Sequence, residues 1–333
     1  MIEKNIHAVD ITVAIPAYNG EKRLPLVLDL LLNQTGLENI NWEITIIDNN
    51  SADQTFELVE KYQKIAKNNN IDLRYFLENQ QGAAFARLRA VKEAKGNIIA
   101  FLDDDNLPDT DWLAAAYKFG IDYPQAGVWS GQIHGAFEVS PPENFSRIQA
   151  FLAIREHGDK PYKFDGDKLK LPPGAALVVR KQVWRENVPE KPILSGKLPG
   201  ILVQGDDYEP LIYIHKAGWQ IWYNPAMHSY HQIPKWRLEK DYLLSIARGC
   251  GLPTFQLLLI NTQKVQIPIV FARTILGGFR RLLGHIIKYR GKIYSDLIVM
   301  FEMEFYWASM LSPFYSCRLY MRRLIDNKGS DNA

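Results

Sequence analysis

Three consecutive carboxylates, Asp103, Asp104 and Asp105, stand where an apolar run, residues 98–102, must reach the surface. Such a run predicts a buried parallel strand, and charges at its end are unfavourable unless a cation neutralises them. Because side chains alternate along an extended chain, Asp103 and Asp105 project to one side and can share one hard divalent cation. Ligands of open α/β sheets bind beyond the carboxyl ends of strands, where this cluster falls. A solvated acidic turn that caps a helix beginning near Asp109 explains the cluster equally well.

A second acidic pair, Asp206 and Asp207, precedes an apolar stretch, residues 211–214, that is typical of a helix. Carboxylates in the first turn interact favourably with the helix dipole, and this ordinary role explains the pair without any chemistry. If the first cluster holds a metal, however, a second carboxylate could act as the general base of a reaction. Both interpretations, helix capping and catalysis, stay open at this point.

Polar loops at residues 16–20 and 48–53 each follow an earlier apolar run. Short polar side chains thus stand at the end of a predicted strand there, as they do in the acidic cluster. Turn formation and helix capping explain them as well as ligand binding does. The chain has no dinucleotide-binding Gly-x-Gly-x-x-Gly after its first strand and no P-loop motif, so a phosphate ligand would need a metal and an arginine. Arg87 is a candidate for this clamp, although a solvated arginine on a helix surface is the commoner outcome.

His231, Trp236 and Arg237 follow the last predicted strand, residues 225–230. Imidazole is a common metal ligand, so His231 could complete the shell of the acidic cluster, although a lone histidine is more often structural. Arg237 offers counter-charge to a diphosphate. We assign Asp206, Trp236 and Arg237 to the acceptor side of the site or to the support of its ligands.

The elements that would position these side chains alternate between strands and helices. This alternation predicts an α/β domain with a mainly parallel sheet covered by helices on both faces. We expect this domain to span residues 1–250, with a donor half at about 1–110 and an acceptor half at about 111–250, followed by a helical segment at 251–333. The predicted strands are residues 11–15, 42–47, 71–77, 98–102, 126–131, 219–223 and 225–230, with another leading up to Arg180.

The composition limits the class of protein. The chain has 333 residues, of which 47% are apolar and 23% charged, as in ordinary folded proteins, and its net charge of +2 is too small to indicate nucleic acid as a partner. Its two cysteines, Cys250 and Cys317, form no spaced pair, which argues against a disulfide framework and a zinc site and fits a reducing compartment. Residues 1–10 lack the apolar run of a signal peptide, so we expect a cytoplasmic protein.

The last part of the chain is rich in apolar residues interrupted by lysine and arginine. No stretch reaches about 18 uncharged apolar residues, so no helix is expected to span a bilayer. Helices are expected at residues 255–260, 267–279 and 286–305. Apolar faces edged with basic residues can lie on the inner, anionic face of a membrane, or they can pack on the preceding domain as a cap.

Five short segments occur in a characteristic order: Ile-Pro-Ala-Tyr-Asn at 15–19, Ile-Ile-Asp-Asn-Asn-Ser-Ala-Asp at 46–53, Gln-Gly-Ala-Ala-Phe-Ala-Arg at 81–87, Phe-Leu-Asp-Asp-Asp at 101–105 and Gly-Asp-Asp at 205–207. Together they resemble the family 2 glycosyltransferases, which have the Rossmann-like GT-A fold. Further segments at 172–175, 222–225 and 231–234 are most similar to the cyanobacterial hormogonium polysaccharide biosynthesis glycosyltransferases.

This resemblance implies a nucleotide-diphosphate sugar donor, with a UDP-sugar as the first choice. It implies that Asp105 and Asp103 bind Mg²⁺ or Mn²⁺, with His231 as a further candidate ligand. Asp207 matches the catalytic base of the family, whereas Asp206 stands where the family usually has glutamate. Asp48 would accept a hydrogen bond from the nucleotide base. The donor-binding residues that follow from the resemblance are Pro16, Tyr18, Asn19, Asp48, Asn50, Arg87, Asp103 and Asp104.

The implied reaction is a metal-dependent, inverting, hexosyltransferase-like transfer. Its acceptor would be a hydroxyl of a growing polysaccharide or lipid-linked saccharide, in the synthesis of an exopolysaccharide near the cytoplasmic membrane face. Two other classes stay open. A metal-dependent phosphohydrolase would use the acidic cluster on nucleotides, and a non-catalytic protein would only bind sugar nucleotides.

Overall fold

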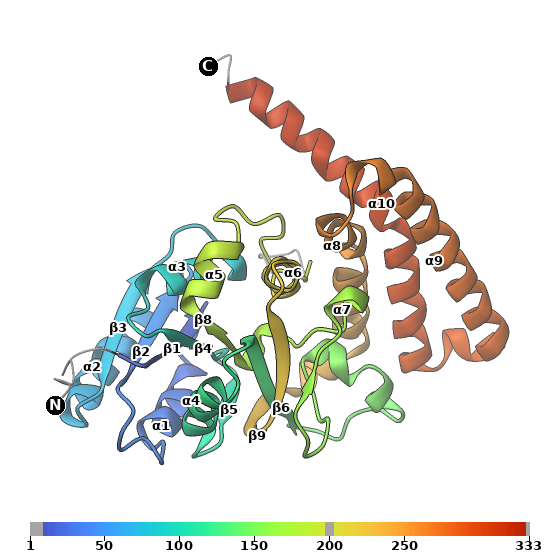
Figure 1. The fold of residues 1–333 in the computed structure, drawn as a ribbon. Coiled ribbons are helices and arrows are strands. Elements are labelled where there is room, and N and C mark those ends of the chain that lie inside the picture. The colour runs from blue at the N-terminus through green and yellow to red at the C-terminus, as the bar shows by residue number, and fades with distance from the viewer. Residues whose placement is uncertain (1–8, 197–202, 331–333) are drawn as a thin grey trace. The chain divides into compact units, whose positions relative to one another are not determined.

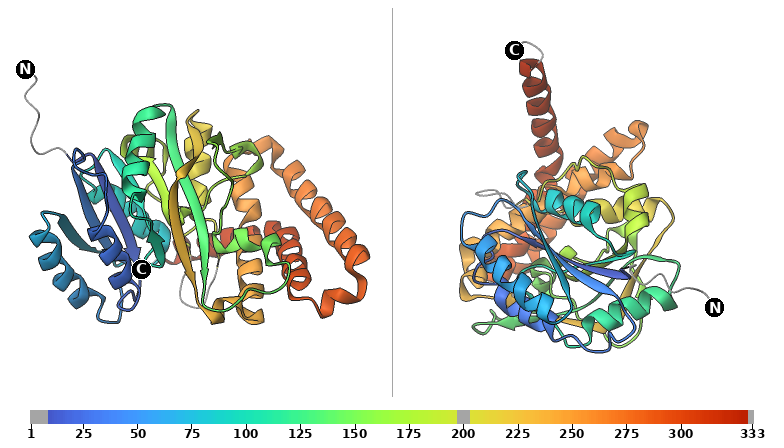
Figure 2. Two further views of the ribbon diagram at one scale, coloured as in Figure 1. Left: turned by 90° about the horizontal axis from the view of Figure 1, so that it is seen from below. Right: turned by 90° about the vertical axis from the view of Figure 1, so that its left-hand side faces the viewer.

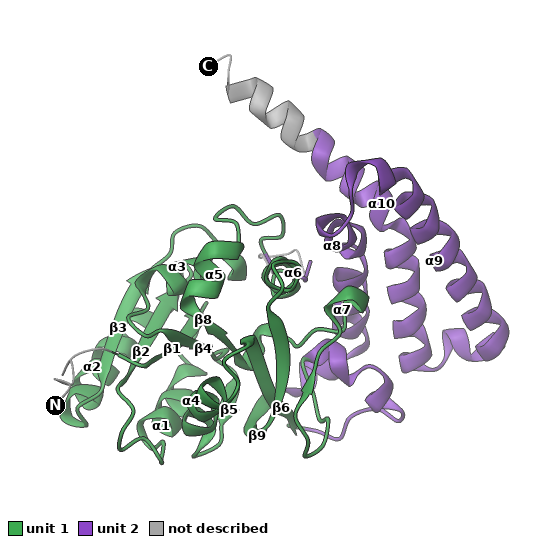
Figure 3. Cartoon of the chain, in the orientation of Figure 1, with its two compact units in different colours: residues 1–138, 153–195, 206–233 green, residues 139–152, 196–205, 234–333 purple. Residues whose placement is uncertain are grey.

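The computed structural model describes residues 9–196 and 203–330. The chain forms two compact units, each assembled from separate stretches of sequence (Figure 3). Unit 1 comprises residues 1–138, 153–195 and 206–233, and unit 2 comprises residues 139–152, 196–205 and 234–333.

Unit 1 is built around a mixed sheet. Its strands are β1 (Ile11–Ala17), β2 (Trp42–Asp48), β3 (Asp72–Leu77), β4 (Ile98–Phe101), β5 (Asn106–Pro108), β6 (Ala126–Phe137), β7 (Tyr162–Lys163), β8 (Leu177–Arg180) and β9 (Gln220–Ile233). In the described residues the strand order is β3-β2-β1-β4-β8-β6-β9-β5, with β7 paired to β9 (Figure 1). The first four strands are parallel, as is the pair β6 and β9, whereas β5, β7 and β8 run antiparallel to their neighbours. The predicted α/β class is therefore confirmed.

Helices cover both faces of this sheet. Those of unit 1 are α1 (Leu24–Leu32), α2 (Thr55–Asn68), α3 (Ala83–Glu93), α4 (Trp112–Asp122), α5 (Lys181–Asn187) and α6 (Tyr208–Lys216). Helices α1 and α4 lie on one face and α3 and α5 on the other (Figure 1), and the right-hand view of Figure 2 shows helices on both sides of the sheet. Leu24 and Leu28 of α1 are fully buried with Val13 of β1 in the main core. Burial of such a side chain contributes about 1.5–3 kcal/mol.

The parallel strands bring the candidate loops to one edge of the sheet. In the register, Ala17 at the end of β1 pairs with Asp48 at the end of β2, and Ala14 pairs with Phe101 at the end of β4. The residues that follow these three strands therefore emerge side by side, as the sequence predicts.

Two predicted strands, 219–223 and 225–230, prove to be one strand, β9. The pairing of β9 with β6 slips where Ser130 faces Tyr223 and Gln132 faces His228, and Pro225 lies within this irregularity. A proline cannot donate a ladder hydrogen bond, so the irregular stretch accommodates it without ending the strand. The same long pairing extends β6 to Phe137, beyond residue 131, where the sequence predicts that this strand ends.

Unit 2 is helical. Its helices are α7 (Lys240–Gly251), α8 (Thr254–Ile260), α9 (Ile267–Tyr289) and α10 (Leu297–Ser330), and α10 packs against the other three. A Cβ on Gly278 of α9 would lie 2.7 Å from the Met310 Cβ, so glycine is required for this close approach. The sequence predicts that the helical segment begins after residue 250. In the structure unit 2 already includes the residues from Pro234 onward, because α7 packs on α10. Residues 139–152 also join unit 2, and the Phe151 ring lies 4.9 Å from that of Phe301.

Within the described residues, one helical stretch, Lys240–Ile260, is long and apolar enough to cross a membrane by length and composition alone. More than half of its apolar window is buried inside the protein. This is weak evidence for a membrane span, because a buried core helix has the same composition.

Candidate active site

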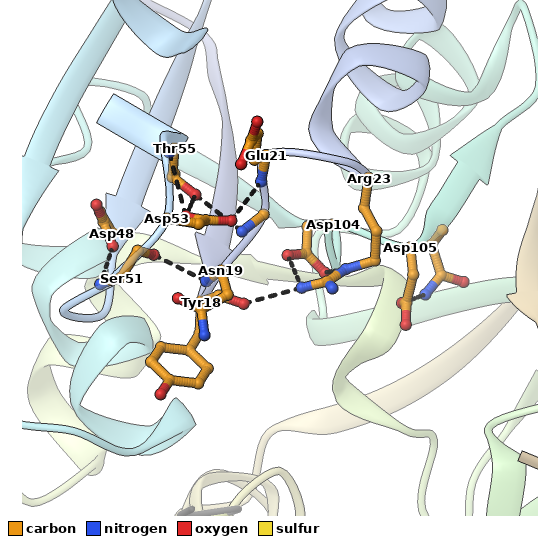
Figure 4. A network of polar contacts seen from close by, with 12 residues as sticks. Tyr18, Asn19, Glu21, Arg23, Asp48, Ser51, Asp53, Thr55, Asp104 and Asp105 are labelled. Carbon is orange, nitrogen blue, oxygen red and sulfur yellow. Dashed lines mark hydrogen bonds and ion pairs between the residues drawn. The ribbon is translucent and has the colours of Figure 1, made fainter. Parts of the chain in front are cut away.

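The loops after β1 and β2 hold each other through short polar side chains (Figure 4). The Asn19 amide donates to Ser51 Oγ at 2.8 Å, and the Asn19 side-chain oxygen accepts from the Ala52 amide at 2.8 Å. The Gly20 amide donates to Thr55 Oγ1 at 2.8 Å. Asn19 has a φ of +51°, a left-handed conformation that asparagine tolerates well. The side chain of Asn19, a predicted donor ligand, therefore fixes the shape of this loop.

Asp48 lies buried at the end of β2. Its Oδ1 accepts from the Ser51 amide at 2.8 Å, and its Oδ2 accepts from the Tyr75 hydroxyl at 2.7 Å. Burial, together with this contact, raises the pKa of Tyr75 above its ordinary value. A carboxylate has about four acceptor positions, so these two bonds leave capacity for a ligand. Tyr75 is not recognisable as a site residue from local sequence, because its contact with Asp48 depends on the β2–β3 register.

The other predicted donor residues occupy different settings. Tyr18 is 40% exposed and can offer a ring face to a base, whereas Pro16 is half-buried in β1. Asn50 is exposed in the loop after β2, with a φ of +65°. Their contacts with a donor stay a prediction.

Asp104 pairs with Arg23, as Figure 4 shows. The Arg23 Nε donates to Asp104 Oδ1 at 3.0 Å, and its Nη2 donates to Oδ2 at 2.7 Å. Such a two-pronged pair is geometrically specific and fixes both side chains. Asp104 therefore anchors the β1 loop to the acidic turn, and Arg23 is a site residue that sequence reasoning missed.

Asp105 faces a different partner, His231. Because β5 pairs antiparallel with β9, Asn106 lies opposite His231, and Asp105 Oδ2 is 3.5 Å from His231 Nε2. No group of three or more potential metal ligands occurs among the described residues. Mg²⁺ and similar cations are often held by one or two carboxylates together with substrate phosphates and water. Asp105 with His231 fits such a partial shell, and the predicted sharing of one cation by Asp103 and Asp105 stays a prediction.

Arg87 joins the two acidic sites of the sequence. Its Nη1 lies 2.6 Å from Asp206 Oδ2, and its Nη2 lies 3.7 Å from Asp103 Oδ1. The side chain is buried, so water does not screen these charges. Residues that are far apart in the chain thus meet around one guanidinium. Because Arg87 is engaged with carboxylates here, its role as a phosphate clamp stays a prediction.

Asp207, the predicted base, lies at the start of α6 next to this pair. Its Oδ2 accepts from the Gly174 amide at 3.1 Å. A Cβ on Gly174 would lie 2.8 Å from Arg87 Nη2 and 2.9 Å from the Asp207 Cβ, so only glycine fits between them. Burial, and then the charge of Asp206, raise the pKa of Asp207 to about 6, while Arg87 and the Gly174 amide oppose this shift. A carboxylate of that pKa can accept a proton near neutral pH.

A buried carboxylate, Glu209, fixes the segment beside Arg87. The Ile193 amide donates to Glu209 Oε1 at 2.8 Å, and the Leu194 amide donates to Glu209 Oε2 at 2.8 Å. The Ser195 carbonyl in turn accepts from the Ala84 amide of α3 at 3.3 Å. This chain of contacts ties α6 to the helix that carries Arg87, and Glu209 is a second residue that sequence reasoning missed.

Trp236 and Arg237, predicted on the acceptor side, belong to unit 2. The Arg237 guanidinium lies 5.3 Å from the centre of the Trp236 ring, a cation–π contact. Their contribution to the site of unit 1 stays a prediction.

Comparison with known proteins places this geometry among sugar-transferring enzymes. The family model described as "Glycosyl transferase family 2" matches residues 12–181. A teichuronic acid biosynthesis glycosyltransferase of Bacillus subtilis is 29% identical over 135 residues, which are 40% of this chain and 51% of the relative. A poly(ribitol-phosphate) β-N-acetylglucosaminyltransferase of Staphylococcus aureus is 31% identical over 139 residues, 42% of this chain and 23% of the relative. The chain thus spans about half, or less, of the length of these relatives.

Solved structures show the same fold. A mannosyltransferase of Pyrobaculum calidifontis, in complex with GDP-Man and Mn²⁺, has a TM-score of 0.58 at 18% identity. The matched region covers 92% of this chain and 87% of the mannosyltransferase chain. The structure of GalNAc-T7 with UDP, GalNAc and Mn²⁺ has a TM-score of 0.51 at 16% identity, covering 74% of this chain and 48% of its own. Unit 1 therefore has the GT-A fold that its motifs predict.

Proposed function

Because the chain belongs to glycosyl transferase family 2, we propose that it transfers a sugar from a nucleotide-diphosphate donor to an acceptor hydroxyl, with inversion at the anomeric carbon and with help from a divalent metal. The observation that carries this proposal is the position of Arg87, 2.6 Å from Asp206 and 3.7 Å from Asp103. Arg87 thus joins the carboxylate cluster proposed to bind the metal to Asp206, the neighbour of the proposed base Asp207.

The donor is proposed to be a UDP-sugar. The GalNAc-T7 structure contains UDP and the Pyrobaculum mannosyltransferase contains GDP-Man, so the fold accepts more than one base. In this chain the exposed ring of Tyr18 and the acceptor oxygens of Asp48 are the groups proposed to receive the base.

The residues perform separate parts of the proposed reaction. Asp207 accepts the proton of the acceptor hydroxyl while that oxygen forms a bond to the anomeric carbon and the bond to the donor phosphate breaks, which inverts the configuration. Arg87 keeps Asp206 and Asp207 in place, and Asp105 with His231 would hold Mg²⁺ or Mn²⁺. When bound, this metal neutralises charge on the departing nucleoside diphosphate.

We predict a pH dependence from the raised pKa of Asp207, about 6. The base works only when deprotonated, so activity is present above this pKa and is lost as the pH falls through it. kcat/KM should decrease about tenfold per pH unit below about pH 6. Initial rates between pH 4.5 and 8 on a protein that remains folded check this, and a flat profile down to pH 4.5 would exclude Asp207 as the base.

A thermal-shift screen of purified protein against nucleotide sugars tests the proposed function. Ligands that bind the folded state raise the melting temperature in proportion to the logarithm of their concentration above Kd. We expect stabilisation by at least one UDP-sugar with Mn²⁺ and much less with EDTA. Stabilisation by no nucleotide sugar in either condition would count against the proposal. Phosphate release from nucleotides without an acceptor would favour a phosphohydrolase instead.

The proposed acceptor is a growing polysaccharide or lipid-linked saccharide at the cytoplasmic membrane face, in exopolysaccharide synthesis as in the cyanobacterial hormogonium polysaccharide enzymes. Peripheral membrane contact through unit 2 is part of this proposal. Leu276 and Ile287 of α9 are 69% and 61% exposed, and α9 carries arginine and lysine but no acidic residue. Each apolar side chain buried in lipid contributes about 1.5 kcal/mol or more.

Replacing both Leu276 and Ile287 with serine should therefore weaken the affinity for anionic liposomes, measured by sedimentation, by about a hundredfold or more, the effect of losing two buried side chains. The exposed apolar residue Leu77 of β3, changed to serine, is the control in unit 1. Equal sedimentation of all three proteins would remove the membrane contact from the proposal.

A further inference from the structure

A pocket of unit 1 is lined by Tyr208, the residue that follows the proposed base Asp207. Its volume is about 560 Å³, within the range of about 300–1,000 Å³ that is usual for small-molecule sites. Tyr208 and Leu171 both line it, and the Tyr208 hydroxyl donates to the Leu171 carbonyl at 3.2 Å. Tyr208 directly follows Asp207, and Gly174, three residues after Leu171, donates to the Asp207 carboxylate. The pocket therefore shares its walls with the elements that hold the base.

Aromatic rings form one part of this pocket. The Tyr162 and Phe164 rings lie 5.1 Å apart, and the His157 ring lies 5.7 Å from that of Tyr162. Aromatic side chains combine a large apolar face with polar edges, so they can pack on the carbon face of a sugar ring and still hydrogen-bond its hydroxyls. Burial, and then the charge of Arg155, lower the pKa of His157 below its ordinary value.

Basic side chains form another part of the lining. Arg155, Lys163 and Lys170 line the pocket, and within the described part of the chain none of the three makes an ion pair. The one acidic residue of the lining, Asp165, is paired with Lys168 at 2.8 Å. Arg155 Nη2 lies 3.5 Å from the Tyr208 hydroxyl, beside the residue that follows the base. A guanidinium and two ammonium groups without carboxylate partners are suited to a carboxylate or a phosphate.

We propose that this pocket binds the acceptor, and that the acceptor is an anionic saccharide or polyol that carries a carboxylate or a phosphate group. The proposal rests on the proposed function, because it needs Asp207 to act as the base. It adds the chemical class of the acceptor, whose anionic group would contact Arg155, Lys163 and Lys170 while its hydroxyl faces Asp207.

Binding of small probes tests the pocket without a donor. Ligand-observed NMR would compare methyl β-glucuronide and glucose 6-phosphate with neutral methyl β-glucoside. The wild-type protein should bind at least one anionic probe about tenfold tighter than the neutral one. The double variant Lys163→Gln/Lys170→Gln should lose most of this preference. The control Lys160→Gln/Lys191→Gln removes the same charge from exposed lysines of unit 1 outside the pocket and should keep it.

The pattern of results separates the two proposals. Equal affinity for charged and neutral probes, or equal losses in the two double variants, would overturn the anionic pocket. Preference for glucuronide alone assigns a carboxylate acceptor, and preference for glucose 6-phosphate alone assigns a phosphate acceptor. Stabilisation by UDP with Mn²⁺ is measured on the same samples, and its absence would overturn the proposed transfer reaction, and with it the acceptor role, even where the anion preference is found.

Discussion

Replacing Asp207 with asparagine should reduce the rate of sugar transfer by about 10²- to 10⁴-fold, the usual contribution of a general base. The amide has nearly the same shape and can still accept from the Gly174 amide, so the site should stay assembled. Donor binding should change little, because the loss falls on the chemical step. Rates with saturating donor, together with the thermal shift caused by the donor, measure the two effects separately.

Asp167→Asn is the matched control for this variant. Asp167 is an exposed carboxylate of unit 1 that contacts His215 of α6 at 3.2 Å, and it has no proposed part in the reaction. It should leave the rate unchanged. An Asp207→Asn protein as active as this control would show that proton transfer does not depend on Asp207.

Replacing Arg87 with methionine should lower the free energy of unfolding by about 3–5 kcal/mol, the usual cost of leaving buried charges without their partner. Arg87 is 7% exposed and lies 2.6 Å from Asp206. Methionine fills much of the space but offers no charge to these carboxylates. The loss should shrink as the pH falls, because protonation removes the repulsion between carboxylates. Chemical denaturation at pH 5 and pH 8 measures both effects.

Arg89→Met provides the comparison on the same helix. Arg89 is partly exposed and pairs with Glu93 at 3.0 Å, a surface pair worth about 0–1 kcal/mol. Equal stability of Arg87→Met and Arg89→Met at pH 8 would mean that Arg87 does not compensate the buried carboxylates.

Arg87 also lowers the pKa of Asp207, so its loss should raise that pKa. The acidic limb of the pH–rate profile of Arg87→Met should therefore move to higher pH.

Local patterns were sufficient to predict the first half of the fold. The buried runs before Asn19, Asp48 and Asp103 indicate strands, and parallel strands place their carboxyl ends at one edge. His231, a candidate ligand of the acidic cluster, lies 3.5 Å from Asp105, and its role as a metal ligand stays a prediction. These successes depend on strand identity, which hydrophobic periodicity reports directly.

The partners of the acidic residues could not be predicted in the same way. Arg23 and Asp104 are 81 residues apart, and Arg87 and Asp206 are 119 residues apart. The local sequence does not indicate that Arg87 is buried and not solvated on its helix surface, because its burial depends on how the loops pack over the sheet. The antiparallel direction of β8 is equally hidden, since a short buried strand has the same pattern in either direction. The division into units depends on distant contacts too, such as that of Phe151 with Phe301.

We propose that the two acidic sites cooperate in an inverting sugar transfer, and this cooperation can be followed at the anomeric carbon. It is tested most directly by incubating the protein with Mn²⁺, α-linked nucleotide sugars labelled with ¹³C at the anomeric carbon, and a panel of neutral and anionic saccharide acceptors, and by following that carbon by NMR. We expect a new glycosidic bond of β configuration, formed by the wild-type protein and not measurably by Asp207→Asn. A product that keeps the α configuration, or nucleotide cleavage that releases phosphate without any new glycosidic bond, would contradict it.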